Sequence, residues 1–118
     1  MSYKITKKQQ AIKYEPPGHF DVLCTRLHNA DEVEDGTIVM GLSHFLPGGG
    51  AEMAPARFEM VYYIAVGEMT VTMESENGNK EDYCLHQGDS IHFDVGQKRA
   101  CLNTGYETAQ MLTLMIKK

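Results

Sequence analysis

Short strand-like segments separated by glycine turns constrain the fold of this chain more than any other feature. The clearest spans residues 68–76, where Met69, Val71 and Met73 alternate with polar side chains as in a half-buried strand. The Asn77-Gly78 pair that follows is favoured in two-residue hairpin turns. No stretch keeps a helical repeat, so the pattern predicts an all-β fold, an antiparallel sandwich or barrel. The other predicted strands cover residues 11–14, 21–27, 37–46, 57–66, 81–86, 90–93, 98–103 and 108–116.

Three segments are predicted to interrupt these strands. Pro47 and the glycines at 48–50 should end the strand over 37–46, because proline lacks a donor and glycine permits turns. Gly67 is predicted to join the strands on either side of it as a hairpin. The acidic residues 29–36 predict a turn or a single helical turn.

Composition excludes several classes of partner. The 118 residues are enough for one domain that buries its own core. The net charge of −5, without a basic block, argues against nucleic acid and anionic membranes as partners. No apolar run approaches the roughly 20 residues that span a bilayer, and the charged N-terminus does not resemble a secretion signal. A cytoplasmic location is therefore expected.

The cysteines are predicted to be reduced thiols. Cys24, Cys84 and Cys101 are odd in number, far apart and without Cys-x-x-Cys spacing. That pattern favours neither a disulfide framework nor a zinc site.

Two glycine-bounded stretches, residues 48–67 and 88–103, carry a family resemblance. Their spacing resembles the two motifs of the cupin superfamily, G-x5-H-x-H-x3-E-x6-G and G-x5-P-x-G-x2-H-x3-N, without insertion or deletion. The resemblance implies a double-stranded β-helix, or jelly-roll barrel, over about residues 36–116. Residues 1–35 would then supply N-terminal strands that pack on this barrel, within a single cupin domain over 1–118.

The resemblance also locates the family's metal ligands, and here they are replaced. Ala54 and Ala56 occupy the two histidine places of the first motif, Met60 the glutamate place, and Arg99 the histidine place of the second. A first-row metal would need three or four nitrogen or oxygen donors at about 2.0–2.2 Å. Alanine offers none, methionine offers a soft thioether, and arginine is a cation. No metal or other cofactor is therefore expected in the barrel.

One alternative keeps a metal. His44 and His92 lie on strands that could turn them into the barrel, where Glu52 or Glu59 would complete a set of three ligands. Nothing in their spacing requires such a site, and histidines that only hydrogen-bond on strands explain the same residues.

Strand alternation predicts which side chains line the pocket. Counting from the family's ligand positions places an apolar set with one phenol and one positive charge inside the barrel. Val66 should face inward with this set. The predicted lining residues are Ala54, Ala56, Met60, Tyr62, Ile64, Arg99 and Cys101, with His44 and His92 as further candidates.

Arg99 carries the sharpest functional hypothesis. Inside an apolar barrel its planar guanidinium would bind a carboxylate, phosphate or enolate oxygen of a small ligand. The structural alternatives are an ion pair with Glu52 or a hydrated position at the barrel mouth. Tyr62 is interpreted either as a general acid or as a core tyrosine, and Cys101 as a small core residue.

Two main classes of function follow. The first is a metal-independent isomerase, epimerase or lyase that acts on a small anionic or sugar-like molecule. The second is a non-catalytic barrel that binds or senses such a ligand. A metal-dependent enzyme with the unusual ligands named above is a third, and oxygenase chemistry is disfavoured. A homodimer is also expected, because residues 37–45 are apolar on both faces. The chain's own segment around Val22 and Leu23 could cover that strand instead.

Overall fold

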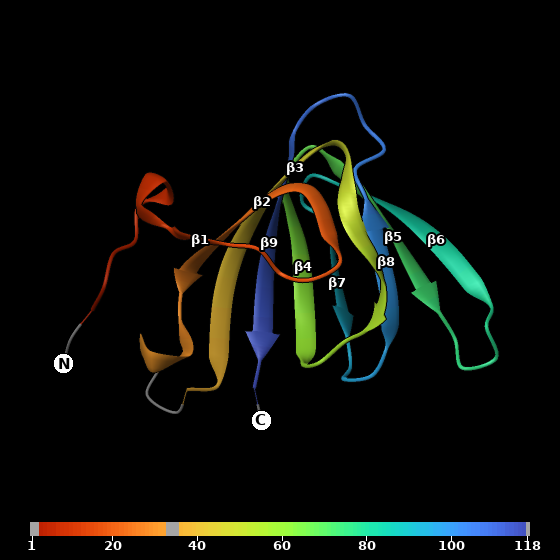
Figure 1. Cartoon of the computed structure of the whole chain (residues 1–118), viewed down its shortest axis with the longest axis horizontal. Helices are drawn as coiled ribbons and strands as arrows, with labels where there is room; N and C mark the ends of the chain where they lie inside the picture. The colour runs from red at the N-terminus through yellow and green to blue at the C-terminus, as the bar shows by residue number, and fades with distance from the viewer. Residues whose placement is uncertain (1–2, 33–35, 118) are drawn as a thin grey trace.

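The structure, a computed structural model, describes residues 3–32 and 36–117 and consists almost entirely of β-strands (Figure 1). Two three-residue 3₁₀ turns, η1 (Lys8–Gln10) and η2 (Ala30–Glu32), are the helical elements of this described part. The predicted all-β fold is confirmed. The strands are β1 (Ile12–Tyr14), β2 (His19–His28), β3 (Ile38–Pro55), β4 (Glu59–Val66), β5 (Glu68–Glu74), β6 (Lys80–His86), β7 (Ser90–Phe93), β8 (Lys98–Leu102) and β9 (Ala109–Ile116).

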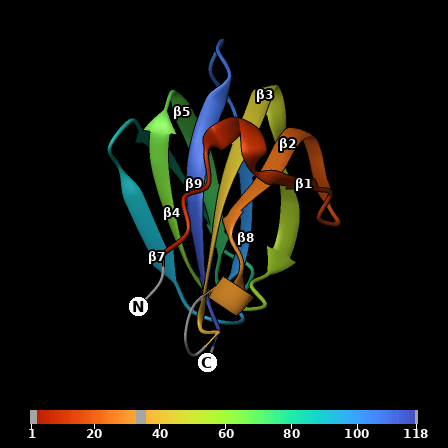
Figure 2. The ribbon, with the colours of Figure 1, turned by 90° about the vertical axis from the view of Figure 1, so that its left-hand side faces the viewer.

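The strands form an antiparallel jelly-roll barrel in the order β6-β5-β8-β3-β9-β4-β7. β1 and β2 extend it from β3, where β2 pairs along most of its length. β3 is the shared element, because its first half pairs with β9 and its second half, Gly50–Pro55, with β8. Figures 1 and 2 show the long strand running from one half of the barrel to the other.

β3 does not end at Pro47, and that prediction was wrong. The strand continues through the three glycines to Pro55. A Cβ on Gly49 would lie 2.1 Å from the carbonyl oxygen of Asp21, and one on Gly50 would lie 2.0 Å from that of Cys101. Gly49 and Gly50 therefore allow the close passage of β3 between β2 and β8.

The predicted hairpin at Gly67 was also wrong. β4 lies between β9 and β7, whereas β5 lies between β6 and β8, so the two consecutive strands are not hydrogen-bonded neighbours. Gly67, with φ of 80°, leads the chain from one half of the barrel to the other. The turn at Asn77-Gly78 does join a true hairpin, β5 to β6.

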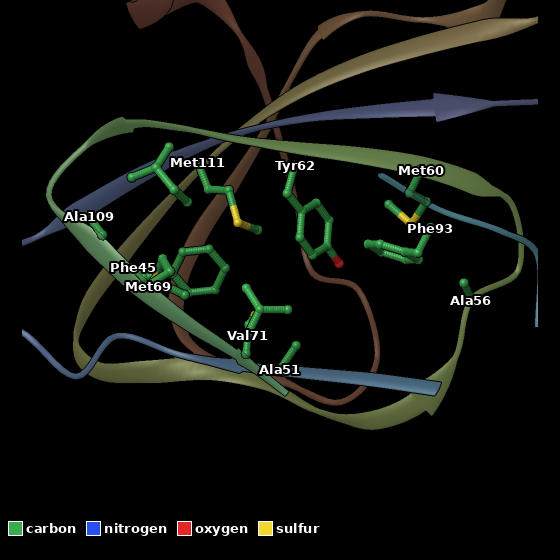
Figure 3. Packing of buried hydrophobic residues seen from close by; sticks show 12 residues of the cluster. Phe45, Ala51, Ala56, Met60, Tyr62, Met69, Val71, Phe93, Ala109 and Met111 are labelled. Carbon is green, nitrogen blue, oxygen red and sulfur yellow. The ribbon is translucent and has the colours of Figure 1, made fainter. Parts of the chain in front are cut away.

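The core follows the predicted alternation. Met69 and Val71 are fully buried, as is Ile64, while the side chains between them face outward. Val66 is instead 40% exposed, because the pairing of β4 with β9 shifts register between Ile64 and Val66. Figure 3 shows the side chains of this core converging from opposite walls of the barrel.

The segment at residues 29–36 is described only in part. η2 provides the single helical turn at its start, and residues 33–35 lie outside the described part of the chain. Neither of the short helical turns in the described residues is long or apolar enough to cross a membrane.

The passage of β3 predicts that Gly50→Ala is strongly destabilising. Its new Cβ would overlap the Cys101 carbonyl, so the free energy of unfolding should fall by about 2 kcal/mol or more. Gly78→Ala is the matched control, because that site is open and only its positive φ is strained, at about 1 kcal/mol. Urea denaturation measures both, and equal losses would contradict this role of Gly50.

Candidate ligand-binding site

The barrel contains a cavity of about 500 Å³, a size that suits a small organic molecule. Its wall comes from β3, β4, β8 and β9, from β1 and β2, and from the turns at residues 16–18 and 57–58. Most of the lining is apolar, with a few polar groups among it. The lining residues are Tyr14, Pro16, Pro17, Gly18, His19, Arg26, Ser43, Phe45, Glu52, Met53, Ala54, Pro55, Arg57, Phe58, Met60, Tyr62, Arg99, Cys101, Met111, Thr113 and Met115.

Arg99 projects into this cavity from β8, next to Ala54 on β3. Its Nε donates a hydrogen bond to the Tyr62 hydroxyl at 2.8 Å, and its Nη1 contacts the backbone carbonyl of Glu52 at 3.5 Å. Among the described residues, no carboxylate forms an ion pair with the guanidinium. The alternative of an internal pair with the Glu52 side chain is therefore not what the structure shows.

Tyr62 fixes the position of this guanidinium. Its ring packs edge-on against Phe93, with centroids 5.0 Å apart, and its hydroxyl points from β4 into the barrel interior (Figure 3). Burial raises the pKa of Tyr62 to about 12, although the nearby Arg99 opposes the shift. The phenol therefore stays protonated at neutral pH and can donate its proton to a bound ligand as a hydrogen bond.

Cys101 is unsuited to nucleophilic chemistry. Burial raises the pKa of its thiol to about 11, an effect that outweighs the favourable charge of Arg99. Because the thiolate is the nucleophile, this residue fits the interpretation as a small core side chain.

His19 is a site residue that the sequence analysis missed. Its Nδ1 lies 3.0 Å from the Pro17 carbonyl, which can only accept, so Nδ1 carries the proton and Nε2 keeps a lone pair. Burial and the charge of Arg99 lower the pKa of His19, which favours the neutral imidazole. His19 reaches the cavity because β2 pairs it with Ala51 on β3, a long-range pairing that no local pattern announces.

The cavity wall is positively charged. Arg26, Arg57 and Arg99 line it, and Glu52 is the one carboxylate among the described lining residues. Arg26 stacks on the Tyr14 ring, with its guanidinium carbon 4.4 Å from the centroid, and its buried Nε has no hydrogen-bond partner. This balance favours an anionic or oxygen-rich ligand.

Five of the nine predicted site residues line the cavity: Ala54, Met60, Tyr62, Arg99 and Cys101. Ala56 and Ile64 lie in the packed core instead. His44 and His92 lie on the outer faces of β3 and β7, because their neighbours Phe45 and Phe93 occupy the inner face. His92 hydrogen-bonds Glu59 at 2.6 Å there.

The sequence and the fold of this chain are similar to those of known proteins. No protein-family model matches the chain. The chain is 34% identical to beta-D-galactosidase Rv1717 of Mycobacterium tuberculosis over 109 residues, which cover 92% of the chain and 90% of that protein. Among solved structures, the polyketide cyclase RemF of Streptomyces resistomycificus superposes with a TM-score of 0.80 at 16% identity, over 99% of this chain and 81% of RemF.

A cupin superfamily protein of Desulfitobacterium hafniense matches with a TM-score of 0.67 at 18% identity, over 82% of this chain and 78% of that one. The chain therefore belongs to the same family as the mycobacterial protein, and these solved structures show that its barrel has the cupin fold. Because these solved structures are only 16% and 18% identical to the chain, they establish its fold and not its chemistry. The chemistry must be argued from the residues of the site.

The metal positions of the superfamily do not fit a metal in this cupin. Ala54, Met60 and Arg99 face the cavity, and Ala56 is buried in the core, so no nitrogen or oxygen ligand set converges there. The alternative set is not assembled inside the barrel either. His92 and Glu59 do meet, with Asp94, but on the outer surface and away from Glu52 and His44.

Proposed function

We propose that this cupin binds a small anionic or sugar-like molecule in its barrel cavity, without a metal at the superfamily's positions. One observation carries the proposal: the guanidinium of Arg99 is held by Tyr62 in an apolar cavity and has no carboxylate partner among the described residues. The Arg99 side chain is half-buried, so water solvates its charge less fully than on an open surface, and an anionic ligand would pair with it. Hydrogen bonds from a positioned guanidinium to a carboxylate are charge-assisted and strong.

The residues around Arg99 support acid–base chemistry on such a ligand. The lone pair on His19 Nε2 and the carboxylate of Glu52 are available to accept a proton, and both residues line the cavity. Arg99 and the protonated Tyr62 would stabilise negative charge that develops on a ligand oxygen. This arrangement suits a metal-independent isomerase, epimerase or lyase. A binding or sensing barrel would use the same anchor without the proton transfer.

Hydrolysis of a β-D-galactoside is a second candidate, favoured by the 34% identity to the mycobacterial protein of that name. Most glycosidases use two carboxylates, about 5–5.5 Å or 6.5–9.5 Å apart. The described wall of this cavity offers Glu52 alone, so His19 would have to take the second role.

Arg99 variants test the anchor. Arg99→Lys keeps the charge and loses the planar fork, so we expect binding of carboxylic acids, sugar acids or sugar phosphates to weaken by about 1.5–3 kcal/mol. Arg99→Met should abolish it, because the charged hydrogen-bond donor is gone. Thermal shifts across a ligand panel measure this, with the exposed Lys13→Met as a charge-matched control. Equal stabilisation of all four proteins would contradict the anchor role.

The hydrolase candidate makes a separate prediction. Purified protein should release nitrophenol from 4-nitrophenyl β-D-galactoside and not from the α-anomer. Glu52→Gln should lower this rate by about 100-fold or more, because it removes the cavity's carboxylate. Glu76→Gln, on an exposed turn, is the matched control. Turnover that is absent, or indifferent to Glu52, would reject hydrolysis while leaving the binding proposal to its own test.

We also propose that the protein is a homodimer through the outer face of β4 and β9. Cross-strand pairs Val61–Leu114 and Tyr63–Leu112 place an apolar strip there, and Tyr63 is 42% exposed. Sedimentation equilibrium at micromolar concentration should show the dimer mass, and Tyr63→Glu should shift it to the monomer. A wild-type protein at monomer mass would refute this arrangement.

A further inference from the structure

A cluster of metal-ligand side chains lies outside the cavity, on the outer face of the β5–β6 hairpin. Cys84 and His86 are two residues apart on β6, so they share one face of the strand. Glu68 on β5 pairs directly with His86, and Thr70 pairs with Cys84. Because Met69 and Val71 point into the core, this face points away from it. In Figure 1 the hairpin stands at the opposite end of the barrel from β1.

The three ligand atoms are already close to tetrahedral spacing. Cys84 Sγ lies 3.2 Å from Glu68 Oε2 and 3.9 Å from His86 Nε2, and that nitrogen lies 3.8 Å from the same carboxylate oxygen. Bonds of about 2.3 Å to sulfur and 2.0–2.1 Å to nitrogen and oxygen place tetrahedral ligands about 3.3–3.6 Å apart. Each separation differs from that range by only a few tenths of an ångström.

We propose that Glu68, Cys84 and His86 form a binding site for Zn²⁺ on the outer surface of the barrel. Thiolate, imidazole and carboxylate are the three ligand types that Zn²⁺ takes in proteins, and three protein ligands leave a fourth position for water. The site is independent of the cavity, since none of its ligands lines it.

Neighbouring groups hold two of the ligands in place. The backbone N–H of His86 donates to Asp89 Oδ2 at 2.8 Å, and the ring Nδ1 lies 4.0 Å from the same oxygen. That separation is too long for a hydrogen bond, so Asp89 holds the backbone of His86 and not its ring. Glu68 packs against Gly105, where a Cβ would lie 2.9 Å from Oε1 and 3.0 Å from Cγ, so that glycine makes room for the carboxylate.

Binding exchanges a proton for the metal. The Cys84 thiol donates to Glu68, whose carboxylate is the main cause that raises the pKa of that thiol. Zn²⁺ would form a Zn–S bond as the S–H proton leaves to solvent, so one proton is released per ion bound. His86 and Asp89 are titratable groups beside these two ligands, and Asp82 lies on the same face of β6.

Thiol reactivity tests the site in untagged full-length protein. Of the three free cysteines, Cys84 is exposed and the other two are buried, so one thiol should react rapidly with Ellman's reagent. One equivalent of Zn²⁺ should slow that reaction about tenfold or more, and EDTA should restore it. Isothermal calorimetry should give one ion per chain.

Variants locate the ligands. Residues that hydrogen-bond to metal ligands contribute about 10–100-fold to metal affinity. Glu68→Gln and His86→Gln each remove a ligand itself, so each should lower the affinity for Zn²⁺ by at least that factor. Cys84→Ser should lose both the reactive thiol and the sulfur-to-metal absorption of the Co²⁺-loaded protein. His92→Gln is the matched control, because His92 belongs to the other exposed cluster, with Glu59 and Asp94.

Loss of metal binding can be told from misfolding, because the variants lie on an outer face and circular dichroism can verify their fold. Retained zinc protection in Glu68→Gln and His86→Gln would overturn the site. Loss of binding in His92→Gln, or failure of Zn²⁺ to protect Cys84 in the wild type, would overturn it equally.

Discussion

The close passage of β3 between β2 and β8 is the constraint on which the barrel depends. One strand serves both halves of the barrel, and at Gly49 and Gly50 the neighbouring carbonyls occupy the space that a side chain would need. That passage sets β8 beside the second half of β3, which places Arg99 opposite Ala54. The position of Arg99 in the cavity therefore depends on a backbone contact several residues away.

The second determinant of the site is the space beside the small residues, such as Ala54, that replace the family's metal ligands. Alanine at 54 gives the guanidinium of Arg99 room to reach Tyr62, and burial keeps that phenol protonated. A fixed positive charge thus stands where other cupins would hold a cation. In the proposed function the same volume would select an anion, because the electrostatic sign of the site is reversed while the apolar wall is retained.

Most of the fold could be predicted from local patterns, and the failures share one cause. Strand positions follow from alternation and turn residues, as β5 and its hairpin with β6 show. The predicted strand end at residues 47–50 and the predicted hairpin at Gly67 were wrong, because a glycine indicates a turn or a close backbone contact without indicating which strand lies near it. His19 and the outer cluster of Glu68, Cys84 and His86 escaped for the same reason: pairing between distant strands assembles them.

The protonation states of the side chains in the cavity limit which of them could accept a proton from a ligand. Tyr62 and Cys101, with pKa values raised to about 12 and about 11, both keep their protons at neutral pH. His19 has its pKa lowered, and its Nδ1 proton is committed to Pro17. Neither the phenol nor the thiol is therefore a base near neutral pH, whereas His19 Nε2 keeps a lone pair that could accept a proton from a ligand. Because Arg99 disfavours the protonated imidazole, an anionic ligand bound to Arg99 would offset that charge and make His19 a stronger base. In the proposed function, ligand binding and the basicity of His19 would thus be coupled through the Arg99 guanidinium.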